Sequence, residues 1–143
     1  MTIARILSSK GREVTTTQPD RTLGEVARLM ADKGIGAVIV TSATGDLLGI
    51  LSERDIVRAV ARQGGEALNE AVSRYMTAKV TTTTQESSVT AVMELMTSGR
   101  FRHVPVMRAG KIDGVISIGD VVKYRLAEIE SESEALRQYI ATA

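Results

Sequence analysis

Cysteine is absent from the chain, and histidine occurs once, as His103. Without cysteine there is no disulfide scaffold, no thiolate nucleophile and no cysteine-ligated zinc or iron–sulfur centre. A single histidine leaves metal-assisted catalysis few ligands to work with. Aromatic residues make up only 3% of the sequence, too few for the stacking platforms that bind single-stranded nucleic acids.

Excess charge and long apolar runs are missing as well. The chain has 18 basic and 17 acidic residues, so its net charge of +1 gives no reason to expect bulk nucleic acid or an anionic membrane as a partner. The longest apolar run, residues 34–40, is far shorter than the roughly 20 residues that cross a bilayer, and the first residues hold no signal-peptide core. We therefore expect a cytoplasmic protein. With 143 residues, 43% of them hydrophobic, it is large enough to bury a core.

The chain does contain an internal repeat. Sequences match at an offset of 66 residues, and then of 65 after one residue is lost in a turn. The matching pairs are 14–17 with 80–83, 29–30 with 95–96, 49–52 with 114–117, and Asp55 with Asp120. Two halves that match along their length indicate a duplicated structural unit.

Each half predicts the order strand, helix, strand, strand, helix. Threonine-rich segments favour extended backbone. Apolar residues at spacings of three and four predict amphipathic helices, which Thr22 and Ser88 can cap. The predicted strands are 14–17, 37–41 and 47–51, then 80–84, 103–107 and 112–116. Helices are expected from Ser52 to residues 63–65, over about 66–75 as a connecting helix, and from Ser117 to near Tyr139.

A unit of about 60 residues is marginally stable alone, so the two units should cover each other. We expect an α+β fold of two repeats related by a pseudo-two-fold axis. The predicted boundaries are 6–74 for the first repeat with its connecting helix, 75–130 for the second repeat, and 131–143 for a C-terminal helix extension.

Both second helices open with a serine followed three residues later by an aspartate: Ser52 with Asp55, and Ser117 with Asp120. This spacing is typical of a capping box, in which each side chain accepts from a free backbone N–H. It also suits a ligand, because a carboxylate can accept hydrogen bonds from ribose hydroxyls and a helix start suits a phosphate. The two interpretations are compatible.

The sequence over about residues 6–126 resembles a tandem pair of CBS domains, the family named after cystathionine β-synthase. The segments that carry the resemblance are Gly-Ile-Leu-Ser-Glu-Arg-Asp at 49–55, Gly-Val-Ile-Ser-Ile-Gly-Asp at 114–120, Tyr-Met-Thr at 75–77, and Arg-Phe-Arg-His-Val-Pro-Val at 100–106. The resemblance implies a regulatory module that binds an adenine nucleotide between its repeats. AMP is the first choice of ligand, with ATP or NAD(H) as alternatives and no metal required. It further implies a homodimer and a regulated partner acting in trans.

By similarity, Asp55 and Asp120 would bind ribose, while Arg102, His103 and Arg54 would face phosphates. The remaining residues would line the two clefts or read the adenine. For the Asp120 site they are Lys10, Arg12, Val14, Ile35, Gly36, Ala37, Ser117 and Gly119; for the Asp55 site they are Ser52, Thr77, Lys79 and Val80. The first repeat has Gly36 and Ala37 where the second has Arg102 and His103, so we expect the two sites to differ.

Two other functions compete with the sensor. Ser117, His103 and Asp120 could form a hydrolase triad, but no Gly-x-Ser-x-Gly elbow accompanies them, so we expect no enzyme activity. An interaction module with vestigial pockets is the alternative, and the intact serine and aspartate in both repeats argue against it. The closing helix repeats apolar residues at helical spacings, which either cover its own repeat or contact a second subunit: Val122, Leu126, Ile129, Leu136 and Ile140.

Overall fold

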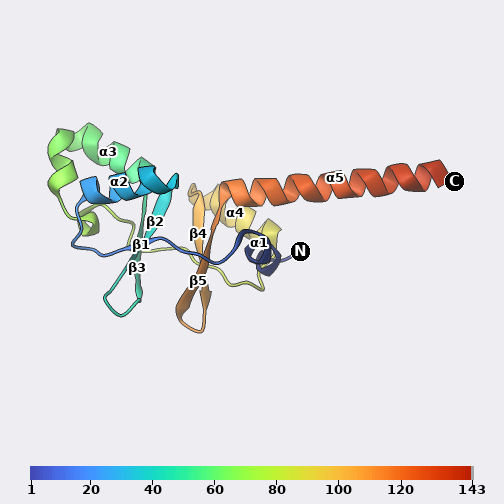
Figure 1. Ribbon diagram of the computed structural model, residues 1–143, viewed down its shortest axis with the longest axis horizontal. Coiled ribbons are helices and arrows are strands. Elements are labelled where there is room, and N and C mark those ends of the chain that lie inside the picture. Colours follow the sequence, from blue (N-terminus) through green and yellow to red (C-terminus); the bar gives the residue numbers. More distant parts are fainter. Residues whose placement is uncertain (143) are drawn as a thin grey trace.

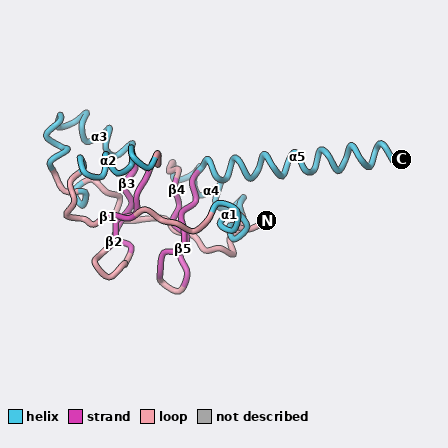
Figure 2. Tube along the Cα trace, viewed as in Figure 1, coloured by secondary structure: helices cyan, strands magenta, loops and turns pink. Residues whose placement is uncertain are grey.

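The computed structural model describes residues 1–142 and has the α+β architecture of two repeats (Figure 1). The first part of the chain forms α1 (Ile3–Lys10), β1 (Thr16–Thr17), α2 (Leu23–Lys33), β2 (Ala37–Thr41), β3 (Leu47–Ser52) and α3 (Glu53–Gln63). Two 3-10 helices, η1 (Gly64–Asn69) and η2 (Val72–Arg74), lead to α4 (Val89–Gly99), β4 (His103–Arg108), β5 (Lys111–Ser117) and α5 (Ile118–Thr142). Figure 2 shows the β2–β3 and β4–β5 hairpins side by side, with helices gathered toward one end of them.

The first repeat is built around β2, which pairs with β1 in parallel and with β3 antiparallel. Residues 38–40 are a run of apolar β-branched side chains, all of them buried. Helix α2 covers Val38 and Val40 with Leu23, Val26 and Met30, which its 3.6-residue period places on one face. The predicted cap is confirmed, since the Thr22 side chain accepts from the backbone N–H of Glu25.

The second repeat has the same plan with a shorter first strand. Instead of a strand over residues 80–84, a single parallel bridge joins Thr83 to Val106. The Thr83 carbonyl and N–H both bond the β4 backbone, but a turn closed by Ser87 N–H to Thr84 oxygen follows at once. The turn leads the chain into α4, where the predicted Ser88 cap is confirmed.

The segment that precedes each repeat packs on the other one. Helix α1, which the sequence interpretation did not include, buries Ile3, Ile6 and Leu7 in the core of the second repeat. The connecting segment packs Ala67 and Val72 into the core of the first. This exchange makes the two repeats one structural unit.

The connecting segment is not the continuous helix predicted over 66–75. Leu23 N–H bonds the Glu70 carbonyl and Val72 N–H bonds the Arg21 carbonyl, so the backbone is drawn against the start of α2. A continuous α-helix would use those groups internally. Gly64, at a φ of +74°, ends α3 and lets the chain turn into the short helices.

Candidate functional site

A cleft of about 440 Å³ lies between the two repeats. Nine residues predicted from the sequence line it: Gly36, Ser52, Arg54, Asp55, Thr77, Lys79, Val80, Arg102 and His103. The prediction missed Ile50, Glu53, Arg58, Thr81, Gly99, Arg100 and Phe101, which line it as well. The structure thus brings the end of β3, the start of α3, the segment after η2 and the start of β4 to one place.

Asp55 is held at the start of α3 by the capping box. Its backbone N–H donates to Ser52 Oγ at 3.3 Å, while its Oδ2 accepts from Ser52 N–H at 2.9 Å and from the Ser52 hydroxyl at 3.0 Å. Both contacts to the carboxylate use the same oxygen, Oδ2. No hydrogen bond from residues 1–142 reaches Oδ1, so this oxygen can still accept from a ligand hydroxyl.

Thr77 is fixed beside the cleft by pairing with the edge of β3. Its N–H donates to the Ile50 carbonyl at 2.9 Å, and its carbonyl accepts from Ile50 N–H at 3.0 Å. Gly49 permits this approach, because a Cβ there would lie 2.8 Å from the Thr77 oxygen and 2.7 Å from Met76 Sδ. The backbone that continues from Thr77 places Lys79 in the lining of the cleft.

The opposite wall is the segment that enters β4. Ile118 N–H donates to the Arg102 carbonyl at 2.8 Å, which ties this wall to the start of α5. In the first repeat, Glu53 N–H bonds the Gly36 carbonyl at 2.9 Å in the same way. The two repeats therefore present equivalent backbone and different side chains to the cleft.

His103 and Gly36 face each other at close range. A Cβ on Gly36 would lie 3.5 Å from His103 Cε1 and 3.5 Å from Glu53 Oε1. Burial lowers the pKa of His103, although Glu53 and Asp120 partly oppose this effect. This lowering favours the neutral form of His103 at neutral pH, and negative charge placed beside it would raise its pKa.

The cleft carries an excess of positive charge. Five permanent cations line it, Arg54, Arg58, Lys79, Arg100 and Arg102, against two carboxylates, Glu53 and Asp55. Over residues 1–142, none of the five cations lies within 4.0 Å of a carboxylate oxygen in the ion pairs of the structure. Unneutralised guanidinium groups in a concave site favour a phosphorylated ligand.

The Asp120 side of the molecule differs, because its aspartate is already engaged. Asp120 Oδ2 accepts from Lys10 Nζ at 2.6 Å and from Ser117 N–H at 2.9 Å, and Lys10 also donates to the Val115 carbonyl at 2.8 Å. Burial alone would raise the pKa of Asp120, but the Lys10 ammonium and the Ser117 hydrogen bonds hold it below its usual range. The structure thus brings together three predicted residues, Lys10, Ser117 and Asp120. Lys10 and Asp120 form an ion pair although they are 110 residues apart in sequence.

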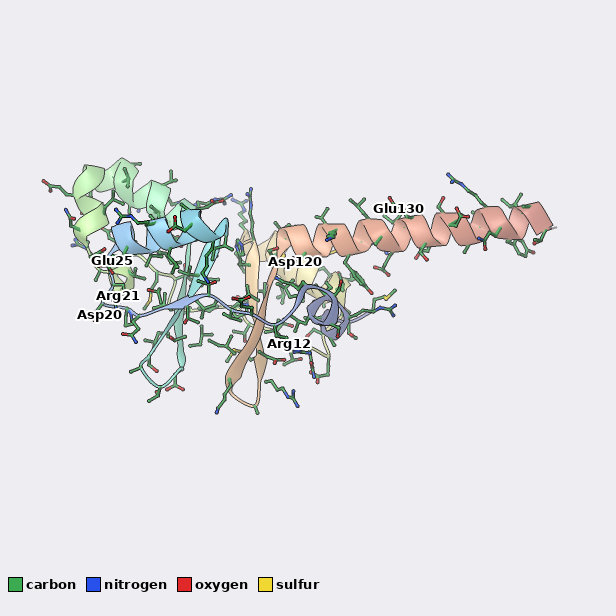
Figure 3. The ribbon with its side chains drawn as sticks, viewed as in Figure 1. Arg12, Asp20, Arg21, Glu25, Asp120 and Glu130 are labelled. Atoms are coloured by element: carbon green, nitrogen blue, oxygen red, sulfur yellow. The ribbon has the colours of Figure 1, made fainter. Side chains whose placement is uncertain are left out.

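The other residues predicted for the Asp120 site have varied surroundings. Arg12 donates to Asp113 Oδ2 at 2.5 Å and to Gln85 Oε1 at 3.1 Å; Figure 3 labels Arg12 and Asp120. Ile35 packs against the first core, Ala37 pairs with Ser52 across the β2–β3 ladder, and Val14 is half-buried. Gly119 is exposed on the first turn of α5.

Sequence comparison decides the family. A profile of the CBS domain matches residues 7–62 and again residues 72–127. The chain belongs to the CBS-domain family. It is 33% identical to the "CBS domain-containing protein CBSX3, mitochondrial" of Arabidopsis thaliana, over 97% of this chain and 71% of that protein. The tandem arrangement and the α+β fold predicted from the repeat are confirmed.

Solved CBS-domain structures share this fold. The CBS-domain protein ATU1752 from Agrobacterium tumefaciens is 49% identical, with a TM-score of 0.86 over 87% of this chain and 99% of that one. The CBS-domain protein PAE2072 from Pyrobaculum aerophilum, solved in complex with AMP, is 27% identical, with a TM-score of 0.75 over 84% and 89% of the two chains.

Two further features bear on the chemistry available to this CBS pair. Within residues 1–142, no three acidic or histidine side chains gather closely enough to hold a metal ion. None of the helices in the same range is both long and apolar enough to cross a membrane. Ser117, the serine of the triad rejected from the sequence, accepts with its Oγ from the Asp120 N–H at 3.1 Å as part of the helix cap.

Proposed function

We propose that this protein is a regulatory sensor, not an enzyme, that binds an adenine nucleotide in the cleft between its CBS repeats. The observation that carries the proposal is the cationic cleft beside Asp55. Among residues 1–142, one wall offers a carboxylate oxygen that accepts no hydrogen bond, and the other offers guanidinium groups that form no ion pair. A ribose monophosphate has complementary groups at both ends.

In this proposal AMP lies across the cleft. Asp55 Oδ1 accepts from the ribose hydroxyls, and Arg102 with His103 binds the phosphate. Thr77, Val80 and the backbone beside them contact the adenine. A volume of about 440 Å³ falls in the usual range for small-molecule sites, roughly 300–1,000 Å³. The AMP complex of the Pyrobaculum relative supports this choice of ligand.

Two of the cations offer an alternative to AMP. Arg54 and Arg58 lie one turn apart on α3 and line the same cleft. They could receive further phosphates, which would extend the ligand class to ATP or the diphosphate of NAD(H). Each additional phosphate adds negative charge to a site with three excess positive charges.

The Asp120 site is proposed as the weaker one. There Lys10 occupies the carboxylate oxygen that also serves the helix cap, so a ribose must use the remaining oxygen or displace the ammonium. Ser117, Gly119, Ile35, Ala37, Val14 and Arg12 remain candidate ligand contacts of this site. The residues predicted for the two sites are proposals that binding measurements must test.

The wider setting is also proposed. We infer a homodimer, a regulated protein that acts in trans, and a cytoplasmic location, with no nucleic acid or membrane as partner. The competing function is an interaction module whose pockets no longer bind ligands. The uncompensated cations of the cleft favour the sensor, because such a cluster repels itself unless an anion neutralises it.

Equilibrium dialysis against AMP, ATP, NADH and S-adenosylmethionine tests the proposal. We expect AMP to bind, and Asp55→Asn to weaken it about ten- to a hundredfold by removing a charged acceptor. Asp32→Asn, on the exposed end of α2, is the matched control and should bind as the parent does. Absence of binding for all four compounds at millimolar concentration would favour the interaction module.

A further inference from the structure

Helix α5 leaves the second repeat as a single rod (Figure 1). Its first turns pack on the core through Val121 and Tyr124, whereas every residue from 129 to 142 is exposed. Seven large hydrophobic side chains are nevertheless exposed along it, Ile118 and Tyr139 among them. The other five form one row: Val122 at 46%, Leu126 at 57%, Ile129 at 47%, Leu136 at 59% and Ile140 at 65%. An isolated surface helix has no physical reason to keep such a row in water.

The spacing of these residues is that of a coiled coil. From Val122 to Ile140 the steps are four, three, seven and four residues, and Ser133 divides the step of seven into four and three. Alternating steps of four and three place residues at the a and d positions of a heptad repeat. We call the six residues Val122, Leu126, Ile129, Ser133, Leu136 and Ile140 the α5 seam.

We infer that the α5 seams of two copies of this chain pair as a parallel, in-register coiled coil. This inference rests on the proposed homodimer and assigns the surface and orientation that the proposal leaves open. In a parallel pair each seam residue meets its own counterpart across the two-fold axis. All five apolar side chains are then covered by the same side chains of the second copy.

The charges that flank the seam favour this orientation. Position 125 of one parallel helix lies beside position 130 of the other, and position 132 beside position 137. These pairs are Arg125 with Glu130, and Glu132 with Arg137, so both are attractive. Two-fold symmetry gives each pair twice. Figure 3 shows Glu130 on the exposed shaft of α5.

An antiparallel pair with full overlap brings like charges together. Position 130 then faces position 130, and position 132 faces position 132, so glutamate meets glutamate at both. Lys123 would face Arg137. Shifting one helix by a heptad removes these repulsions but uncovers part of the seam. One direction places Leu136 and Ile140 beside residues 119 and 115 of the partner, at or before the start of its α5, and the other leaves Val122 and Leu126 facing no residue of the partner's range 1–142. Only the parallel register satisfies both the apolar seam and its charges.

Disulfide trapping tests the orientation without background, because the chain has no cysteine. In the parallel pair the Ile140→Cys side chains face each other, and oxidation should convert most of the protein to a covalent dimer. In the fully overlapped antiparallel pair the two cysteines are separated by about 27 Å, from 18 residues at about 1.5 Å each. Gln138→Cys, on the outer face of the helix, is the control and should stay uncrosslinked.

Three outcomes would overturn the inference. The first is no crosslink for Ile140→Cys. The second is equal crosslinking of Ile140→Cys and Gln138→Cys. The third is a mixed disulfide between Ile140→Cys and Val122→Cys chains, which the antiparallel pair predicts.

Sedimentation separates failure of the seam from failure of the proposed dimer. Leu136→Glu should raise the dimer dissociation constant at least tenfold, whereas Ser131→Glu, which adds the same charge to the outer face, should not. A Leu136→Glu protein that remains as dimeric as the parent would place the dimer contact elsewhere and refute the seam. A monomeric parent would refute both. Nucleotide binding, assayed separately, does not depend on this result.

Discussion

Replacing Arg102 with alanine should weaken the binding of AMP but not that of adenosine. Arg102 lines the cleft at the start of β4 and has no carboxylate within 4.0 Å among the ion pairs of residues 1–142, so its charge is available to a phosphate. A charge-assisted hydrogen bond contributes about 1.5–3 kcal/mol. Because Arg102 is solvent-exposed, water screens the interaction and the lower end applies, which is about a tenfold loss.

The test is a calorimetric titration of the parent and the variant with adenosine, AMP and ATP. The loss should grow with the number of phosphates, and adenosine should bind both proteins alike. Arg108→Ala provides a control of equal charge change, because Arg108 is exposed at the far end of β4 and does not line the cleft. An equal loss for adenosine and AMP, or an equal loss in the Arg108→Ala protein, would refute a phosphate-binding role for Arg102.

Three other changes have expected outcomes. Burial favours the neutral form of His103, whereas a bound phosphate would favour its protonated form, so AMP should bind more tightly as the pH falls from 8 toward 6. Calorimetry on the His103→Gln protein should show a weaker pH dependence of AMP binding. An unchanged pH dependence would contradict this role of His103. Asp120→Ala should lower the free energy of unfolding in urea by about 0.5–2 kcal/mol at neutral pH by removing the cap. Since its pKa is held below the usual range, this stabilisation should vanish only as pH falls through that lowered value, and a difference that persists in stronger acid would contradict the assignment. Gly49→Ala should destabilise the fold by about 1–3 kcal/mol through its clash with Met76 and Thr77, unlike Gly65→Ala, where a Cβ meets nothing within 4 Å.

Local features of the fold could be predicted from the sequence. The Thr22 and Ser88 caps and the two serine–aspartate boxes depend on residues three positions apart, so their spacing already contains the geometry. The hairpins could be predicted because in each of them two apolar segments flank a short turn that contains a glycine. Arg58 could have been found as well, because it lies one turn beyond Arg54 on the same helix.

Features that depend on tertiary contacts could not be predicted in this way. The connecting segment was predicted as one helix because its hydrogen bonds to Arg21 and Leu23 cross between elements. Lys10 and Asp120 form an ion pair although they are 110 residues apart in sequence. The pair exists because α1, which precedes the first repeat, packs on the core of the second repeat. The sequence pattern of the first ten residues does not indicate which of the two repeats α1 packs on.

The asymmetry of the two sites follows from the close approach of the repeats. Gly36 and Arg102 have equivalent backbone roles, since the carbonyl of each accepts from the first residue of the following helix. A side chain at Gly36 would extend toward His103 and Glu53, which already lie 3.5 Å from its Cβ position. An arginine at position 36 would therefore crowd His103 and add a cation to a cleft that already has an excess of positive charge. Glycine at position 36 of the first repeat therefore leaves room for the side chains at positions 102 and 103 of the second. The strand cations of this chain thus come from the second repeat alone and line the cleft beside Asp55, whereas the cation beside Asp120 is Lys10, which already pairs with that carboxylate.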